Sequence, residues 1–168
     1  MRAYMTNPCL PLLLGTLALG VSPSAGQANQ RPVDFVGVFH PGVPSLTLDR
    51  QRCPDPTHPL LFTFQGEAYT TAGHARFEQS HCEAADHTSF SRGLQTISFD
   101  DGDQLFGRYS GLLHVTPTTQ VDGRLIIDGT YRNTGGTGRF RFAHGSGISA
   151  GAVDTMTGIA VISVSGTL

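Results

Sequence analysis

The chain has 168 residues, of which 13 are acidic and 11 basic, so its formal net charge is −2 at pH 7. This weakly acidic balance argues against a nucleic-acid-binding protein, which normally carries a basic surface. The length suits one domain with its own hydrophobic core.

Residues 1–28 have the layout of a secretory signal peptide. Arg2 precedes an apolar stretch over residues 10–21, and small residues follow up to Ala28, which is the usual order of charged, apolar and cleavage regions. The apolar stretch is shorter than the roughly 20 residues that span a bilayer. We expect cleavage after Ala28, a secreted or periplasmic mature chain of 168 − 28 = 140 residues, and no membrane span after removal of the signal. A retained N-terminal tether is the alternative.

The rest of the chain is patterned for β-structure. Residues 29–59 are rich in proline and glycine, so we expect a lead-in with one possible edge strand at residues 33–39. Residues 60–168 alternate apolar and polar side chains, which predicts a series of strands. These strands are expected at residues 60–70, 74–82, 87–91, 94–99, 104–116, 124–132, 139–142 and 158–168.

This pattern predicts an all-β fold, and no segment carries a sustained helical stripe. Strands joined in sequence by tight turns form a closed antiparallel up-and-down β-barrel or a sandwich. We favour a barrel of about eight strands over residues 60–168. The last strand is apolar on both faces, at Ile159 and Val161 and at Ile162 and Val164. It can pair with an early strand and remove the sheet edges.

Two cysteines, Cys53 and Cys82, lie beyond the signal peptide, and an even pair in an exported chain predicts a disulfide. Cys53 precedes one expected strand and Cys82 ends the next, so the two lie at neighbouring ends of a hairpin. A metal site at Cys82 with His81 and His87 is the alternative, but it lacks a second ligand cluster. We expect neither a metal nor a cofactor.

The strand alternation also predicts which side chains face the lumen of the barrel. A mostly apolar pocket with a few convergent polar groups is the usual small-molecule site. The expected polar groups are His81, Tyr109, Tyr131 and His144. The expected apolar wall is made of Phe62, Phe64, Phe77, Phe140 and Phe142. Glu67 has the opposite parity and enters the lumen only if its strand slips by one residue, so it is a reserve candidate acid. The alternative is that these side chains fill a solid core.

Residues 135–145 read Gly-Gly-Thr-Gly-Arg-Phe-Arg-Phe-Ala-His-Gly. This segment resembles the G-G-T-G-x-F-R-x-A-x-G signature of dirigent proteins, and it is similar to the glycine turn and strand of the allene oxide cyclase barrel superfamily. The resemblance extends over residues 60–168 and includes Gly102-Asp103-x-x-Phe106. It departs from the pattern at His144, where dirigent sequences carry arginine. The family's early catalytic carboxylate is not matched either; Asp34 lies in about the right region.

The resemblance implies an eight-stranded barrel with an apolar lumen, often a trimer, that holds a reactive hydrophobic intermediate during stereocontrolled cyclisation or coupling. Three hypotheses follow for this chain. The first is an exported barrel that binds a small hydrophobic molecule without converting it. The second is a cyclase or isomerase in which Tyr109, Tyr131 and His144 act by hydrogen bonding and proton transfer, with Glu67 in reserve. The third is a structural envelope protein with a filled barrel.

Overall fold

The computed structural model describes residues 33–115 and 123–168. The expected signal peptide, residues 1–28, lies outside this range. The described strands are β1 (Asp34–Pro41), β2 (Ser45–Leu48), β3 (Leu60–Thr70), β4 (Gly73–Glu83), β5 (Ser89–Phe99), β6 (Gln104–Val115), β7 (Arg124–Gly136), β8 (Ser146–Asp154) and β9 (Ala160–Thr167). One short 3-10 helix, η1 (Gly138–Phe140), follows β7. No helix in this part of the chain is long and apolar enough to cross a membrane.

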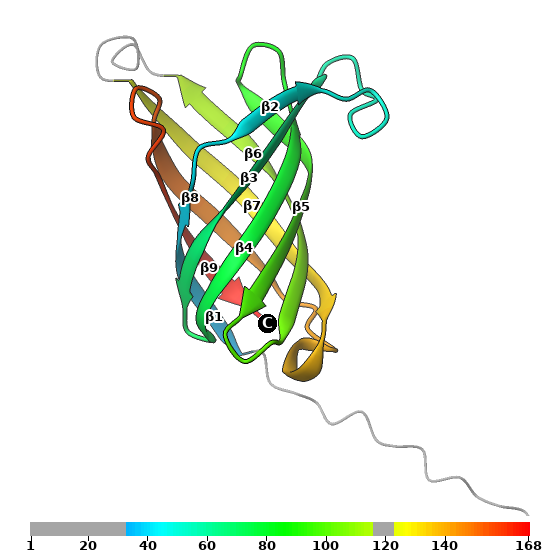
Figure 1. Cartoon of the computed structure of the whole chain (residues 1–168), viewed down its shortest axis with the longest axis vertical. Coiled ribbons are helices and arrows are strands. Elements are labelled where there is room, and N and C mark those ends of the chain that lie inside the picture. Colours follow the sequence, from blue (N-terminus) through cyan, green and yellow to red (C-terminus); the bar gives the residue numbers. More distant parts are fainter. Residues whose placement is uncertain (1–32, 116–122) are drawn as a thin grey trace, which may run out of the picture. The chain divides into compact units, whose positions relative to one another are not determined.

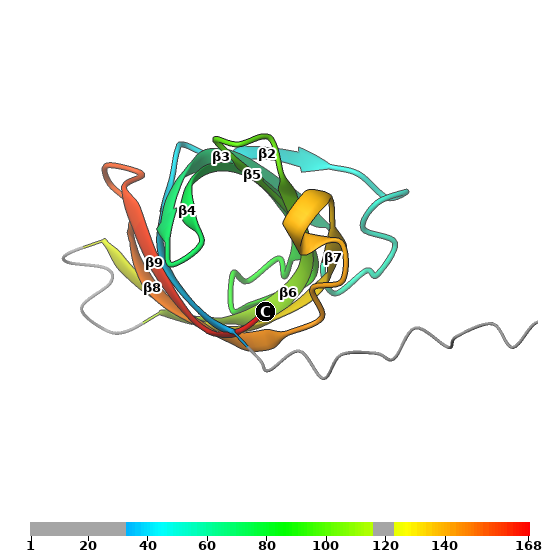
Figure 2. The same ribbon diagram turned by 90° about the horizontal axis from the view of Figure 1, so that it is seen from below.

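The strands close into a barrel (Figures 1 and 2). Each pairs antiparallel with its neighbour in the order β1-β9-β8-β7-β6-β5-β4-β3, and β1 also pairs with β3, which completes the ring. The short strand β2 continues along β3 beyond β1. The fold is therefore all-β: a closed eight-stranded antiparallel barrel with one additional strand. The expected pairing of the last strand with an early one is confirmed, because β9 lies between β8 and β1.

The first strand differs from the expectation. Residues 33–39 were expected at most as an edge strand before a barrel beginning at residue 60, but β1 is hydrogen-bonded on both sides. Its in-facing Phe35 and Phe39 are buried to 1% and 2% exposure. These two rings make β1 an interior strand, and the barrel begins at Asp34.

The segment after β7 also differs. The expected strand at residues 139–142 is wrong: the chain turns through η1 there. Gly138 has φ +49°, and a Cβ at this position would lie 1.7 Å from Oδ1 of Asp103, so only glycine lets the chain fold back so closely. The true next strand is β8, at residues 146–154. Its alternation is hard to recognise because two in-facing positions, Gly147 and Gly151, carry no side chain.

The two ends of the barrel are packed differently. At the lower end in Figure 1, which carries η1 and the β3–β4 and β5–β6 turns, in-facing residues such as Ile97 and Leu105 are fully buried. At the upper end, which carries the β4–β5 turn, in-facing Phe62, Leu113 and Leu125 are only half-buried. The lower half of the barrel is therefore a solid core, and the upper half is where solvent reaches the lumen.

Candidate functional site

The lower end of the barrel is closed by η1. Phe140 is buried and stacks on Phe99, with ring centroids 4.7 Å apart and an interplanar angle of 28°. The Arg139 guanidinium lies over both rings, at 5.0 Å and 4.7 Å from their centroids. It also pairs with Asp101 at 3.0 Å and donates to the carbonyl of Ala72 at 2.9 Å. The glycine-rich segment thus seals one end of the lumen.

Above this core lies a small cavity of about 70 Å³. Its wall is mostly apolar, with a few polar side chains that converge from β4, β5 and β6. The lining residues are Phe39, Phe64, Gln79, His81, Phe90, Gln95, Tyr109, Leu113, Ile127, Ser149, Ile162 and Val164. This composition is typical of a site for a small ligand.

A chain of hydrogen bonds runs from this cavity to the upper end. The Tyr109 hydroxyl lies 3.0 Å from Nδ1 of His81. Nε2 of His81 lies 3.2 Å from Oε2 of Glu83, and the other oxygen of Glu83 contacts Nδ1 of His87. Because an ionised carboxylate only accepts hydrogen bonds, Nε2 of His81 donates to Glu83. In the tautomer with its proton on Nε2, Nδ1 of His81 accepts the hydroxyl hydrogen of Tyr109.

Glu83 is the carboxylate in the middle of this chain of hydrogen bonds, between His81 and His87. It is 5% exposed, and burying a carboxylate is costly unless it is paired and hydrogen-bonded. Both of its oxygens have histidine partners. One of these, His87, lies in the β4–β5 turn with φ +56°, a backbone conformation that residues other than glycine rarely adopt. Strain of this kind is common at functional sites.

The imidazole of His81 is held by aromatic rings. Phe62 stacks on it with centroids 5.5 Å apart and planes 17° apart. Phe90 lies at 4.9 Å and Phe64 at 5.6 Å. These contacts and its two hydrogen bonds hold the His81 ring in one orientation, with Nδ1 toward Tyr109 and Nε2 toward Glu83.

Burial raises the pKa of Tyr109 well above its usual value, and the positive charge of Arg52 opposes this effect only in part. The phenol therefore stays protonated at neutral pH and acts as a hydrogen-bonding group. Burial also raises the pKa of Tyr131, whose hydroxyl has no hydrogen-bond partner among the described residues. Tyr131 lies opposite Tyr109 on β7 but packs against Phe35 in the lower core.

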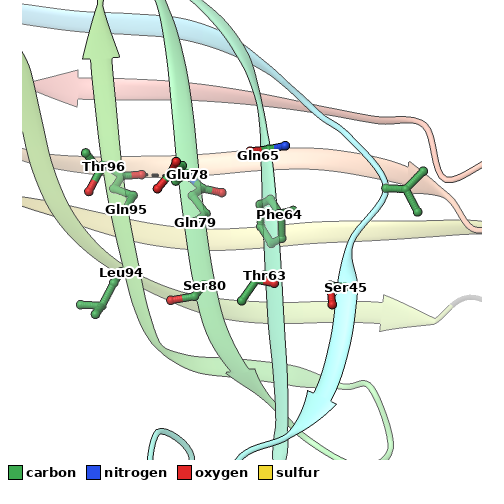
Figure 3. A pocket seen from close by; sticks show the side chains of 11 residues that line it. Ser45, Thr63, Phe64, Gln65, Glu78, Gln79, Ser80, Leu94, Gln95 and Thr96 are labelled. Carbon is green, nitrogen blue, oxygen red and sulfur yellow. Dashed lines mark hydrogen bonds between the residues drawn. The ribbon is translucent and has the colours of Figure 1, made fainter.

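A second polar pair lies in the same lumen. Nε2 of Gln79 donates to Oε1 of Gln95 at 3.0 Å (Figure 3). Both glutamines also line a hollow of about 460 Å³ that opens on the outer wall along β2, β3, β4 and β5. Gln79 and Gln95 therefore line both the inner cavity and this hollow.

The structure brings together only part of the predicted site. Phe62, Phe64, His81 and Tyr109 meet in the upper lumen, whereas Phe77 and Tyr131 belong to the lower core. Phe140 closes the lower end. Phe142 is 72% exposed and His144 is also exposed, because the expected strand at residues 139–142 is a turn. Glu67 is on the outer face opposite Arg76, so β3 has not slipped.

Glu83 is the main residue of the site that the strand pattern did not predict. The expected strand ended at Cys82, whereas β4 runs through Glu83. Extending the alternation of Phe77, Gln79 and His81 by one more step would have placed Glu83 on the same inner face.

The predicted disulfide is present: the sulfurs of Cys53 and Cys82 are bonded. Cys82 therefore offers no thiolate, and the alternative metal site with His81 and His87 loses its proposed sulfur ligand. Within residues 33–115 and 123–168, no group of three or more metal-ligating side chains has a suitable arrangement.

No protein-family model matches the sequence, and no curated protein matches it. Among solved structures, the chain is similar to a conserved protein of unknown function from Rhodopseudomonas palustris. The two share 10% sequence identity with a TM-score of 0.48, over 82% of this chain and 99% of that one.

Proposed function

We propose that the upper lumen binds the end of a small hydrophobic molecule, whose polar group contacts Tyr109. The observation that carries the proposal is the apolar cavity with the hydrogen-bonded Tyr109–His81 pair in its wall. An apolar wall favours a hydrophobic occupant, and a few fixed polar groups such as the Tyr109–His81 pair orient it.

The size of the cavity limits the ligand. Its volume is about 70 Å³, well below the roughly 300–1,000 Å³ of most ligand pockets and the roughly 150 Å³ of an engineered cavity that binds benzene. We infer that an alkyl end or a small ring edge enters it. The remainder of the ligand lies among the half-buried side chains of the upper end, such as Phe62 and Leu113.

A titration with 1-octanol and with octane, followed by NMR, tests this proposal. The alcohol is expected to perturb the signals of Leu113 and Ile127, and to bind more tightly than octane because it can hydrogen-bond to Tyr109. In Tyr109→Phe the preference for the alcohol is expected to fall about two- to tenfold, the usual contribution of one hydrogen bond. Tyr69→Phe is the matched control, since Tyr69 is 54% exposed on the outer wall. Absence of binding by the wild type would favour a filled structural barrel.

A cyclase or isomerase of the allene oxide cyclase or dirigent-like type is the second candidate. The hydrogen-bond chain from Tyr109 through His81 to Glu83 favours it. When His81 is protonated, its Nδ1 donates to the Tyr109 oxygen and frees the phenol hydrogen for a ligand oxygen. As water takes the α-proton of a ketone ligand, Tyr109 can pass its proton to the oxyanion that develops and take one from His81, whose imidazolium is stabilised by Glu83 until then.

Hydrogen–deuterium exchange at the α-carbon of cyclopentanone in D₂O tests this second candidate. The wild type is expected to accelerate exchange, and Glu83→Gln to abolish the acceleration while 1-octanol binding survives. Equal exchange rates with and without the protein leave only the binding function.

We also propose that the protein is exported and acts outside the cytoplasm. The proposal rests on the signal-like residues 1–28 and on the Cys53–Cys82 bond, which suits an oxidising compartment. Cell fractionation checks it: the mature chain is expected in the periplasm or medium, lacking residues 1–28.

A further inference from the structure

Four arginines converge on a groove in the wall of the barrel, whose lining also includes Tyr109 and Tyr131. The groove has a volume of about 690 Å³. Arg108 and Arg132 come from β6 and β7, Arg92 comes from β5, and Arg52 reaches in from the loop before β3. The chain has only 11 basic residues and a net charge of −2, so four cations in one groove concentrate positive charge. We call these four residues the arginine groove.

The arrangement is unfavourable without a ligand. Arg108 and Arg132 are directly opposite each other in the antiparallel β6–β7 ladder, and like charges in this position repel. Both side chains are exposed, so neither is needed to fill the core. If Arg108 and Arg132 only completed the sheet, neither position would need a positive charge.

Among the described residues, no carboxylate lines the groove to balance this charge. Arg139, at the lower end of the barrel, is by contrast paired with Asp101. The pKa of the exposed Asp55 is lowered mainly by hydrogen bonds from Thr57, and the charge of Arg92 contributes least to this effect. Asp55 is not part of the groove lining.

The groove is nonetheless built by specific contacts. Arg52 follows Asp49, whose carboxylate accepts a hydrogen bond from the Arg52 backbone N–H at 2.9 Å, and precedes Cys53, which is bonded to Cys82. Its guanidinium donates to the carbonyl of Arg92. Arg92 lies in a β-bulge with φ +54°, a rare conformation for a side-chain-bearing residue. The disulfide-anchored loop and the bulge thus hold two of the four cations in place.

We propose that the arginine groove binds a polyvalent oxyanion, such as a group of linked phosphates. Neighbouring strands are about 4.8 Å apart, so guanidinium groups on three strands fit charges about 5–10 Å apart. Guanidinium forks bind phosphate and carboxylate oxygens in a bidentate manner. The exposed hydroxyls of Ser110 and Thr130, the next cross-strand pair, are further donors in the groove.

Calorimetry at low ionic strength with inorganic tripolyphosphate, citrate and monovalent phosphate tests the proposal. The wild type is expected to bind tripolyphosphate more tightly than monovalent phosphate, and citrate shows whether carboxylates also fit. Arg108→Gln and Arg132→Gln are each expected to weaken tripolyphosphate binding about tenfold or more. Arg76→Gln removes the same charge from the outer wall of β4, where Arg76 faces Glu67, and is expected to leave binding unchanged.

Thermal unfolding provides a second readout. Arg108→Gln relieves the repulsion, so its unfolding midpoint without ligand is expected to match or exceed that of the wild type. Tripolyphosphate is expected to raise the midpoints of the wild type and of Arg76→Gln more than that of Arg108→Gln. Equal affinity of Arg76→Gln and Arg108→Gln would overturn the proposal, because binding would then follow net charge and not the groove. No binding of tripolyphosphate by the wild type at millimolar concentration would overturn it as well.

Discussion

Tyr109 and Tyr131 are opposite each other on β6 and β7, yet their surroundings differ. Tyr109 is hydrogen-bonded to His81 in the upper lumen, whereas the hydroxyl of Tyr131 has no partner among the described residues. Burial raises the pKa of both phenols above the usual 10.0. One tyrosine therefore serves the candidate site and the other serves the core.

These raised pKa values predict a loss of stability in alkali. Below about pH 10 the folded and unfolded chains both keep the phenol protons. Above it the unfolded chain releases them while the folded chain does not, so stability falls by up to about 1.4 kcal/mol per pH unit for each buried tyrosine. Urea unfolding from about pH 9 to about pH 11 measures this slope. Tyr109→Phe is expected to reduce it, and Tyr69→Phe, in an exposed position, to leave it unchanged. An unchanged slope in Tyr109→Phe would contradict the burial of this phenol.

Glu83 carries a second prediction at this scale. Glu83→Gln leaves a neutral amide that can accept from only one of His81 and His87 at a time, since its nitrogen is a donor. We expect a loss of about 2 kcal/mol in unfolding free energy, the usual range for hydrogen bonds to charged groups. Glu67→Gln, on the outer wall, is expected to change it by less than about 0.5 kcal/mol. Equal effects of the two substitutions would show that Glu83 is not a paired buried charge.

The sequence predicts single residues well where a strand is regular. Parity alone placed Phe62, His81 and Tyr109 inside, because each follows an uninterrupted alternation. The same parity extends to Glu83, but the expected strand ended at Cys82 because a polar residue at the end of β4 resembles the start of a loop. Parity could not reveal the hydrogen bonds of Glu83, since those depend on how the β4–β5 turn brings His87 back.

At the scale of elements, the turn into η1 explains why the segment before it is rich in glycine. The alternation of residues 139–142 is typical of a strand, but Gly138 turns the chain and directs Phe140 onto Phe99. A local pattern of four residues cannot distinguish these outcomes, because the deciding contact is with Asp103, on a different turn. The long strands β3, β4 and β6 were predictable because their alternation continues over many residues.

A pair of phenylalanine substitutions tests this assignment of η1. Phe140→Ala is expected to reduce the free energy of unfolding by about 3–5 kcal/mol, the cost of removing a buried ring. Phe142→Ala is expected to change it by less than about 0.5 kcal/mol, because its side chain is 72% exposed. Similar large losses of unfolding free energy for both substitutions would instead support the expected strand at residues 139–142, with both rings facing inward.

For the barrel taken as a whole, closure and unequal filling explain where a site can exist. The β1–β3 pairing removes the sheet edges and gives the in-facing side chains a common interior. Large side chains fill the lower half, whereas in-facing side chains at the upper end, such as Phe62 and Leu113, are only half-buried. The closure of an antiparallel barrel could be predicted from the sequence, but the amount of free space could not, because it depends on how side chains from eight strands meet.

A crystal structure determined under xenon pressure tests the central claim most directly. Xenon occupies small apolar cavities, so we expect a xenon peak between Phe64, His81 and Leu113 in the upper lumen and none in the lower core. A lumen that takes up no xenon, with Phe64 and Leu113 in contact across it, would contradict the account and leave a solid barrel.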